Sequence, residues 1–412
     1  MAEHRPPVVL APGISHADLA PDLFAHGPIA QVVLPGGVKL WAITHHDALK
    51  EALNTQPDDF VRNAAYWRAL NDGEIDPAHP IVAMFNGVDS MLQTDDPDHK
   101  RVRQLVQKAF TRRGIQKLQP RVAAVVAELL DEVETAGSER VVDLKEEFAV
   151  PLPIRVISEL LGIPAEDQAR AHDLTTRTLS GLHEGAVDEL CAFIDATIEY
   201  KRGHPDEGLI SQMIAVRDSD DARLSPKELR DNVLLFYTAG YETTMGVITS
   251  GVQALLEHPG QMELIRTGQV EWAQAIEEIL RWQSSAALIP MMFTAREVEV
   301  GGIPLPKGEP LLLAYMAANR DPQVFERAND FDITREPAPH LAFGHGVHRC
   351  LGEPLARLEL EIALPAVFER LRDMHLWGQR PGPAPSLMMN HPASLRVVLA
   401  RHVGLGASMA TA

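Results

Sequence analysis

Residues 343–352 read Phe343-Gly344-His345-Gly346-Val347-His348-Arg349-Cys350-Leu351-Gly352 and carry the most information in this chain. They place one cysteine among flexible glycines, directly ahead of a predicted helix. A thiolate is a strong, soft donor to iron, and glycines let the backbone approach a flat cofactor closely. The stretch therefore predicts that Cys350 binds a metal-containing cofactor.

The surroundings of Cys350 differ from those of the only other cysteine, Cys191. Cys191 lies in the apolar helical stretch Leu190-Cys191-Ala192-Phe193-Ile194, so we interpret it as a buried hydrophobic side chain. Two cysteines are too few for a four-cysteine zinc or iron–sulfur site. Pro354 comes early in the helix after Cys350, which puts the sulfur near a helix N-terminus, where backbone N–H groups favour the thiolate.

The composition indicates an ordinary globular protein of the soluble, cytoplasmic kind. The chain has 412 residues, of which 45% are hydrophobic and 23% charged. It has no apolar run of signal-peptide length and no uninterrupted apolar stretch of the ~18 residues that a membrane span needs. The formal net charge of −19 argues against nucleic acid as a partner.

Helical periodicity dominates the chain, and strand signals are short and peripheral. The predicted helices cover 121–135, 152–162, 185–202, 226–257, 271–283 and 354–372. The predicted strands form a hairpin over 32–41 and lie at 298–300, 311–315 and 395–399. Neither a linker nor a repeat is visible, so we expect one α-rich domain over residues 1–412 with small peripheral β-sheets.

The longest predicted helix has clear boundaries. Ser225, Pro226 and Glu228 combine an N-cap serine, a proline at the first helical position and a capping-box glutamate. His258-Pro259 ends the helix. The length between them is about 48 Å at 1.5 Å per residue, enough to cross a domain. A helix this long and this apolar is expected in the interior.

A polar motif, Ala239-Gly240-Tyr241-Glu242-Thr243-Thr244, interrupts the middle of that helix. The hydroxyl of Thr243 can donate to the carbonyl of Ala239 and, with Gly240, loosen the helix locally. A carboxylate such as Glu242 can relay protons through water to a neighbouring hydroxyl. The motif therefore predicts a proton-delivering site in the helix centre.

Together with Glu278-Ile279-Leu280-Arg281 and with His99 and Arg103, these motifs resemble, in the same order, the cytochrome P450 haem-thiolate family of the soluble bacterial type. The cysteine loop of that family reads Phe-Gly-x-Gly-x-His-x-Cys-x-Gly. The resemblance implies a mainly α triangular fold with a long central helix, and haem b with Cys350 as the axial iron ligand. The further cofactor contacts that it implies are His99, Arg103, Ala239, Gly240, Phe343, Gly344, His348 and Gly352.

The resemblance also assigns roles around the haem. Glu242 becomes the acid and Thr243 the alcohol of the oxygen-activation motif. Glu278, Arg281 and Arg335 become a charge network that holds the cysteine loop.

One position departs from the family pattern. Many soluble members place a propionate-binding arginine where this chain has Met292, and Arg296 falls on the opposite face of the strand. We expect the haem to depend more on His99, Arg103 and His348.

The expected substrate is a hydrophobic small molecule of the steroid, terpenoid or polyketide kind. By the resemblance, its pocket is lined by Phe85, Phe236, Ala287, Leu288, Ile289, Met388 and Met389. The stretch from Phe60 to Leu70 also looks like that of bacterial members acting on steroids or macrocyclic polyketides.

The other expected partners are O2 and an electron donor, a separate iron–sulfur ferredoxin with its reductase. Residues 99–117 carry no acid, and the ferredoxin is expected on this basic face. Its basic residues include Lys100, Arg101, Lys108, Arg112 and Arg113.

Two alternatives stay open. A peroxide-driven haem-thiolate enzyme would often lack the acid–alcohol pair of Glu242 and Thr243. A non-catalytic haem-thiolate sensor or ligand-binding protein would need the cysteine and the pocket but no proton relay.

Overall fold

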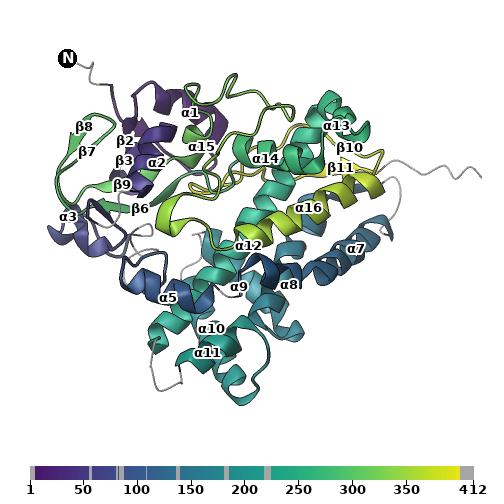
Figure 1. The fold of residues 1–412 in the computed structure, drawn as a ribbon, viewed down its shortest axis with the longest axis horizontal. Coiled ribbons are helices and arrows are strands. Elements are labelled where there is room, and N and C mark those ends of the chain that lie inside the picture. Colours follow the sequence, from purple (N-terminus) through teal and green to yellow (C-terminus); the bar gives the residue numbers. More distant parts are fainter. Residues whose placement is uncertain are drawn as a thin grey trace, which may run out of the picture.

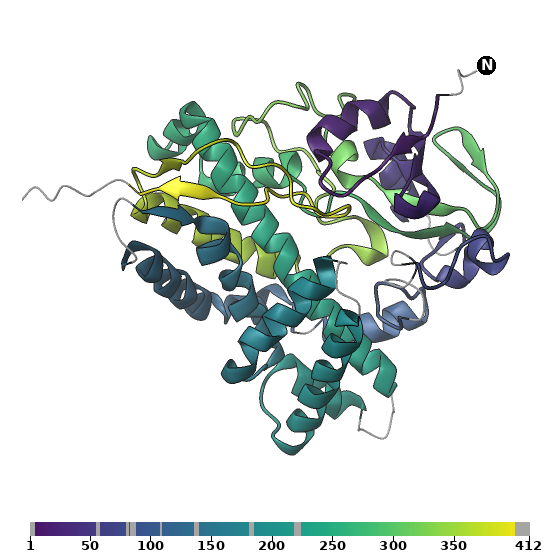
Figure 2. The ribbon, with the colours of Figure 1, turned by 180° about the vertical axis from the view of Figure 1, so that it is seen from behind.

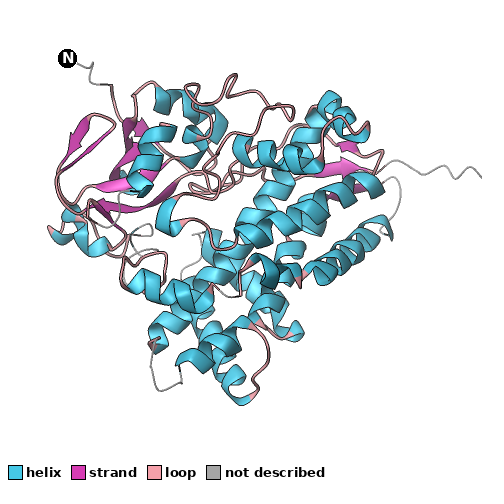
Figure 3. Cartoon of the chain, in the orientation of Figure 1, coloured by secondary structure: helices cyan, strands magenta, loops and turns pink. Residues whose placement is uncertain are grey.

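The computed structural model describes residues 5–54, 58–79, 82, 88–107, 109–135, 140–180, 185–217 and 224–399. Helices make up most of this part of the chain, and the strands gather at its edges, giving a triangular outline (Figures 1 and 3). The mainly α fold with small peripheral sheets is thereby confirmed.

The long central helix, α12 (Pro226–Glu257), begins and ends where the sequence predicts. The Glu228 N–H donates to the Ser225 hydroxyl over 3.0 Å, and the Ser225 N–H donates to the Glu228 carboxylate over 2.7 Å. Figures 1 and 2 show α12 crossing the molecule, with helices packed around it. Its helical neighbours include α8 (Pro151–Leu161), α10 (Ala186–Gly203), α14 (Trp272–Trp282) and α16 (Glu353–Arg370).

The remaining helices complete the bundle and cover the larger sheet. They are α1 (His16–Phe24), α2 (His46–Asn54), α3 (Arg68–Asn71), α5 (Asp98–Val106), α6 (Arg112–Gln116), α7 (Gln119–Thr135), α9 (Gln168–Ser180), α11 (Leu209–Arg217), α13 (Pro259–Arg266) and α15 (Tyr315–Ala318). Shorter 3-10 turns lie at Pro35–Gly37, Ala64–Tyr66, Ala165–Asp167 and Gly346–His348, and a π-helical turn lies at Lys145–Ala149.

The largest sheet has six strands in the order β1-β2-β3-β9-β6-β4. These are β1 (Val8–Val9), β2 (Ile29–Val33), β3 (Lys39–Ile43), β9 (Pro310–Leu313), β6 (Ile289–Thr294) and β4 (Phe60–Val61). The smaller sheets are β10 (His375–Leu376), β11 (Arg396–Val398) and β5 (Val141–Asp143), and the hairpin of β7 (Val298–Val300) and β8 (Ile303–Leu305).

The strand predictions are confirmed with one correction. The hairpin around Gly36 and Gly37 forms between β2 and β3, and both glycines have positive φ, which other residues adopt only with strain. The strand predicted over 311–315 is wrong at its end, because β9 stops at Leu313 and Tyr315 begins α15.

The cysteine loop lies where two parts of the core meet. The largest cluster of buried side chains surrounds α12, and two smaller clusters lie on the two faces of the six-stranded sheet. Leu341, just before the loop, belongs to a sheet cluster, whereas Phe343 packs against the helical cluster. The loop therefore spans the junction between helices and sheet. A single domain over 1–412 stays a prediction.

Candidate active site

The cysteine loop is a tight turn that needs its glycines. Gly344 and Gly346 have φ angles of 68° and 69°, in the left-handed region. A Cβ atom at Gly346 would also collide with the carbonyl oxygen of Leu53 in α2. The Cys350 N–H donates to the carbonyl of Phe343 over 2.8 Å and closes the loop. The glycine spacing thus fixes the direction in which the sulfur points.

The Cys350 sulfur lies at the N-terminus of α16, as predicted from Pro354. It accepts hydrogen bonds from the backbone N–H groups of Gly352 and Glu353. The residue is exposed by surface area, yet protein atoms surround it closely enough for burial to raise the pKa of the thiol. The two N–H groups and the Arg103 charge lower that pKa. A bound metal ion would complete the stabilisation of the thiolate.

Two histidines meet at the loop: His99 of α5 is buried, and His348 of the loop itself is half-buried. The rings of His99 and His348 are 4.2 Å apart, and the Nε2 atom of each has no hydrogen-bond partner among the residues that the structure describes. Burial lowers the pKa of His348 to about 2, with Arg62, His99 and Arg103 acting in the same direction. Buried polar groups are normally paired, so these donors suit the carboxylates of a buried anionic cofactor.

Arg103 lies on the same helix as His99, but its side chain hydrogen-bonds to the backbone of the cysteine loop. Its guanidinium donates to the carbonyl of Arg349 over 2.8 Å, in the cysteine loop. The interaction places a positive charge next to Cys350 and ties α5 to the loop. With Cys350, His99 and His348, it forms a donor set that fits a haem: one sulfur for iron and several cationic or N–H groups for its propionates.

The middle of α12 has the local geometry that the motif predicts. The Thr243 hydroxyl donates to the Ala239 carbonyl over 2.8 Å. Ala239 is exposed, although most of the helix after it is buried. Gly240 has a packing role, because a Cβ there would lie 2.9 Å from the Ile157 side chain, and its contact with a cofactor stays a prediction. Gly240 therefore lets α8 approach α12 closely.

The predicted acid, Glu242, faces a histidine that the sequence did not point to. The Glu242 Oε1 atom lies 3.7 Å from the Nε2 atom of His391, which is 4% exposed in its side chain. His391 follows the C-terminal turn of Met388 and Met389 by two residues. The structure thus links the centre of α12 to that turn.

A second carboxyl, Glu359, was missed by the sequence analysis. It lies on α16, is almost fully buried, and burial raises its pKa to about 8, although a hydrogen bond with Thr244 of α12 acts in the opposite direction. One signal was available: Glu359 is four residues from both Leu355 and Ala363, on the apolar face of the predicted helix. The group is neutral at pH 7 and can donate a proton.

The expected charge network is present. Arg281 donates to both oxygens of Glu278 over 2.7 Å, and Arg335 approaches Glu278 to 3.2 Å. Arg281 also donates to the carbonyl of Asn319, whose side chain accepts the Leu341 N–H at the start of the cysteine segment. The network is therefore connected to the loop through Asn319.

The predicted pocket residues occupy different neighbourhoods. Phe85 lies outside the described residues. Phe236 packs in the helical cluster, with its ring 5.6 Å from that of Phe110. Ala287 and Leu288 are buried in the cluster on one face of the six-stranded sheet.

Among the pocket residues that the structure describes, Ile289, Met388 and Met389 are partly exposed and the others are buried. The strand and the C-terminal turn do meet, because the N–H groups of Ala287 and Leu288 donate to the Met388 carbonyl.

The predicted basic face is only partly available. Lys100, Arg112 and Arg113 are exposed. Arg101 is engaged in ion pairs with Asp98 and Glu228. Lys108 lies outside the described residues. Helix α6, which carries Arg112 and Arg113, packs against α16, the helix that follows Cys350.

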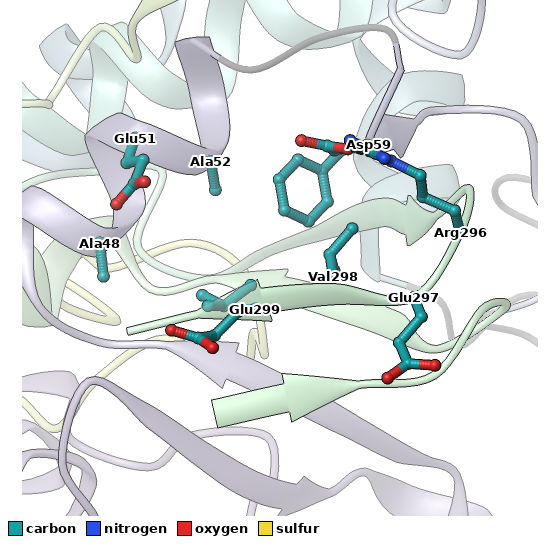
Figure 4. A pocket seen from close by; sticks show the side chains of 10 residues that line it. Ala48, Glu51, Ala52, Asp59, Arg296, Glu297, Val298 and Glu299 are labelled. Atoms are coloured by element: carbon teal, nitrogen blue, oxygen red, sulfur yellow. Dashed lines mark hydrogen bonds and ion pairs between the residues drawn. The ribbon is translucent and has the colours of Figure 1, made fainter. Parts of the chain in front are cut away.

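A cavity of about 230 Å³ lies elsewhere, between α2 and the segment around β7 (Figure 4). Glu51, Asp59, Glu297 and Glu299 line it together with Arg296, which pairs with Asp59. Arg296 lies in the bend between β6 and β7, so strand parity does not place it; its side chain lines this cavity. The cavity contains none of the predicted site residues.

No helix among the described ranges is both long and apolar enough to cross a lipid bilayer.

Comparisons with known proteins agree with this geometry. A family model described as Cytochrome P450 matches residues 272–397. The chain is 40% identical to a 6-deoxyerythronolide B hydroxylase from Saccharopolyspora erythraea over 350 residues, 82% of this chain and 85% of that protein. It is 37% identical to a vitamin D(3) 25-hydroxylase from Pseudonocardia autotrophica over 353 residues, 84% of each chain.

A solved structure described as "Testerone bound CYP154C4 from Streptomyces sp. ATCC 11861" has the same fold. It superposes with a TM-score of 0.92 at 35% identity, covering 97% of this chain and 100% of that chain.

Proposed function

The chain belongs to the cytochrome P450 family, and we propose that it inserts one oxygen atom from O2 into a C–H bond of a hydrophobic small molecule. It is a monooxygenase whose cofactor is haem b. The observation that carries the proposal is the position of Cys350, whose sulfur accepts hydrogen bonds from two backbone N–H groups at the start of α16. When bound, a thiolate-ligated haem supplies the activation of dioxygen.

Four residues of this chain would hold the haem. Cys350 would bind the iron through Sγ, and the hydrogen bonds from Gly352 and Glu353 moderate how much charge the sulfur donates. The unpartnered Nε2 atoms of His99 and His348 would donate to propionate oxygens. Arg103 adds positive charge on the same side of the loop.

Proton delivery falls to side chains of α12 and its neighbours. The Thr243 hydroxyl, now donating to Ala239, can turn to hydrogen-bond a reacting group beside the exposed Ala239. Glu242, the residue before Thr243, can pass on a proton that it receives near His391. Glu359, protonated at pH 7, is a second proton store and reaches α12 through Thr244.

The substrate is proposed to be of the steroid, terpenoid or polyketide kind. Partly exposed Ile289, Met388 and Met389 provide an apolar and adaptable lining. The names of the two relatives, a 6-deoxyerythronolide B hydroxylase and a vitamin D(3) 25-hydroxylase, support large hydrophobic substrates. Titration with macrolactones, steroids and terpenes should shift the Soret band for at least one class; no shift with any of them contradicts this part.

Electrons are proposed to come from an iron–sulfur ferredoxin and its reductase. Lys100 of α5 and Arg112 and Arg113 of α6 are exposed basic residues on a chain whose net charge is −19. Helix α6 packs against α16, the helix after Cys350, so an acidic ferredoxin docked at Arg112 and Arg113 would be close to the cysteine loop.

A labelling experiment tests the reaction and separates the alternatives. The holoenzyme is supplied with a surrogate ferredoxin, its reductase, NADPH and ¹⁸O2, and product is analysed by mass spectrometry. One labelled oxygen atom in the product supports the proposal. Label-free product formed only with hydrogen peroxide identifies a peroxide-driven enzyme, and absence of product with a tightly bound ligand identifies a sensor or carrier.

A further inference from the structure

Arg62 is a buried cation beside the haem-binding histidines that no motif explains. It follows β4 directly and is 3% exposed. Its guanidinium donates to the hydroxyl of Tyr315, and its backbone N–H donates to both oxygens of Asp95 over 3.0 and 2.9 Å. Burying a guanidinium is costly unless anionic or strongly accepting groups surround it, so its position requires a reason.

The strand register places Arg62 opposite Met292. In the antiparallel pair of β4 and β6, Phe60 faces Thr294 and Val61 faces Phe293. One step further along the same register brings Arg62 across from Met292. Residues directly opposite share one face of the sheet, with Cβ atoms about 4.5–5.5 Å apart.

The clusters of buried side chains confirm which residues of β4 and β6 share a face of the sheet. Phe60 and Met292 pack in one cluster, whereas Val61 and Phe293 pack in the cluster on the other face. Arg62 therefore shares the face of Met292, the position where many members of the family carry a propionate-binding arginine.

The Arg62 side chain also reaches the cysteine loop. Its backbone partner, Asp95, also accepts the His99 N–H through its carbonyl over 2.9 Å. Its partner Tyr315 has its hydroxyl 3.4 Å from the position of a Cβ on Gly344. Arg62 is thereby linked to the cysteine loop through Tyr315 and to α5 through Asp95, where the His99 ring lies 4.2 Å from that of His348.

We propose that Arg62 binds a haem propionate and supplies, from the neighbouring strand, the positive charge that Met292 lacks. The inference rests on the proposed haem site but concerns a different contact. A propionate offsets the burial of the guanidinium, and the planar guanidinium can hold both carboxylate oxygens at once. The positive charge that binds the propionate would then come from the residue after β4 and not from its neighbour on β6.

The test compares two haems that differ only in their carboxylates. Purified apoprotein of the parent and of Arg62→Met is titrated with protohaem and with protohaem dimethyl ester, whose propionates are uncharged, and dissociation constants are measured by quenching of tryptophan fluorescence. We expect Arg62→Met to weaken protohaem binding by about 10- to 100-fold, the range for a charge-assisted hydrogen bond, and to leave the ester's affinity nearly unchanged.

Two further variants sharpen the comparison. Arg296→Met removes an exposed arginine that pairs with Asp59 at the cavity beside α2, and it should change neither affinity. The double variant Arg62→Met/Met292→Arg returns a cation to the other side of the ladder and should recover preference for protohaem over the ester. If Arg62→Met does not fold, Arg62→Gln replaces it, since its amide can still donate to Tyr315 without a charge.

If the Arg62 variant loses affinity equally for protohaem and for the ester, the role of Arg62 is structural and the proposal is overturned. Unchanged affinity for protohaem would also overturn it. Both results leave the proposed function intact, provided that the parent holoprotein shows the spectrum of thiolate-ligated haem. A parent without that spectrum would instead contradict the haem-thiolate assignment itself.

Discussion

Glu359 of α16 is hydrogen-bonded to Thr244 of α12, which joins the helix after the thiolate to the helix that carries the proton-delivery motif. Glu359 is 1% exposed. Burial raises its pKa to about 8, from an ordinary value of 4.5. A carboxyl that stays protonated at neutral pH inside the core makes the stability of the fold depend on pH.

The sign of that dependence follows from proton linkage. Between pH 4.5 and 8 the folded chain keeps the Glu359 proton that the unfolded chain has released. The stabilisation is therefore complete below pH 4.5 and is lost as pH rises to 8, at up to about 1.4 kcal/mol per pH unit. Glu359→Gln, which is always neutral, should lack this loss. The measurement is the free energy of unfolding in urea at pH 5.5 and 7.5.

A matched control is available on the same helix. Glu361 is exposed, so Glu361→Gln should keep the pH slope of the parent. The difference in slope between parent and Glu359→Gln cancels the other titrating groups. If the free energy of unfolding changes equally with pH in the parent and in Glu359→Gln, then Glu359 is ionised in the folded state.

Breaking the buried charge network should lower the free energy of unfolding more than a substitution on the surface does. Glu278→Gln leaves the buried Arg281 and the partly buried Arg335 without their carboxylate, and such a loss costs about 3–5 kcal/mol. The free energy of unfolding measures it, and haem retention reports whether the cysteine loop loosens with it. Glu271→Gln, at the exposed start of α14, is the control. A loss below about 1 kcal/mol would place Glu278 among ordinary surface pairs.

Local signals were enough to predict α12 and the cysteine loop. Ser225, Pro226 and Glu228 act on their immediate neighbours, and the glycines of the loop set its φ angles by themselves. The sulfur's place at the start of α16 follows from the same short-range rules. These features need no knowledge of what lies across the molecule.

The surroundings of Arg62 and Glu359 could not be predicted in this way, because their contact partners are far away in the sequence. The proposed role of Arg62 depends on its place opposite Met292 of β6, 230 residues later, and Glu359 meets Thr244 on another helix. The pocket shows the same limit. Phe236 and Leu288 are both apolar, but only packing puts them in separate clusters.

The Thr243 hydroxyl should govern how efficiently reducing equivalents reach product. Thr243→Ala removes the group that can hydrogen-bond beside Ala239, so proton delivery is misdirected and hydrogen peroxide is released. Product per NADPH should fall by about tenfold or more while NADPH consumption continues. Both quantities are measured in the reconstituted system with a surrogate ferredoxin.

Thr249→Ala is the matched control for that experiment. Thr249 makes the same bond to a carbonyl four residues back, Met245, but lies further along α12. Its variant should keep the coupling of the parent. If Thr243→Ala couples as well as Thr249→Ala does, the hydroxyl has no part in proton delivery.

Electrostatic docking of ferredoxin should be sensitive to salt and to two arginines. Arg112 and Arg113 are exposed on α6, which packs against the helix after Cys350. Replacing both with Glu should slow reduction of the haem by ferredoxin, measured by stopped flow, and should flatten its dependence on salt. In the parent, raising the salt concentration from low values to about 0.1 M, where the Debye length is about 10 Å, should slow the same step.

The control must change the net charge equally without touching that face. Lys39 lies on β3 and Lys307 follows β8; both are exposed, and the double change to Glu alters the charge by the same amount. Steering by overall charge would slow both double variants alike, whereas docking beside the cysteine loop slows only the one on α6. A rate that ignores salt and both substitutions would leave the basic face without a role in electron transfer.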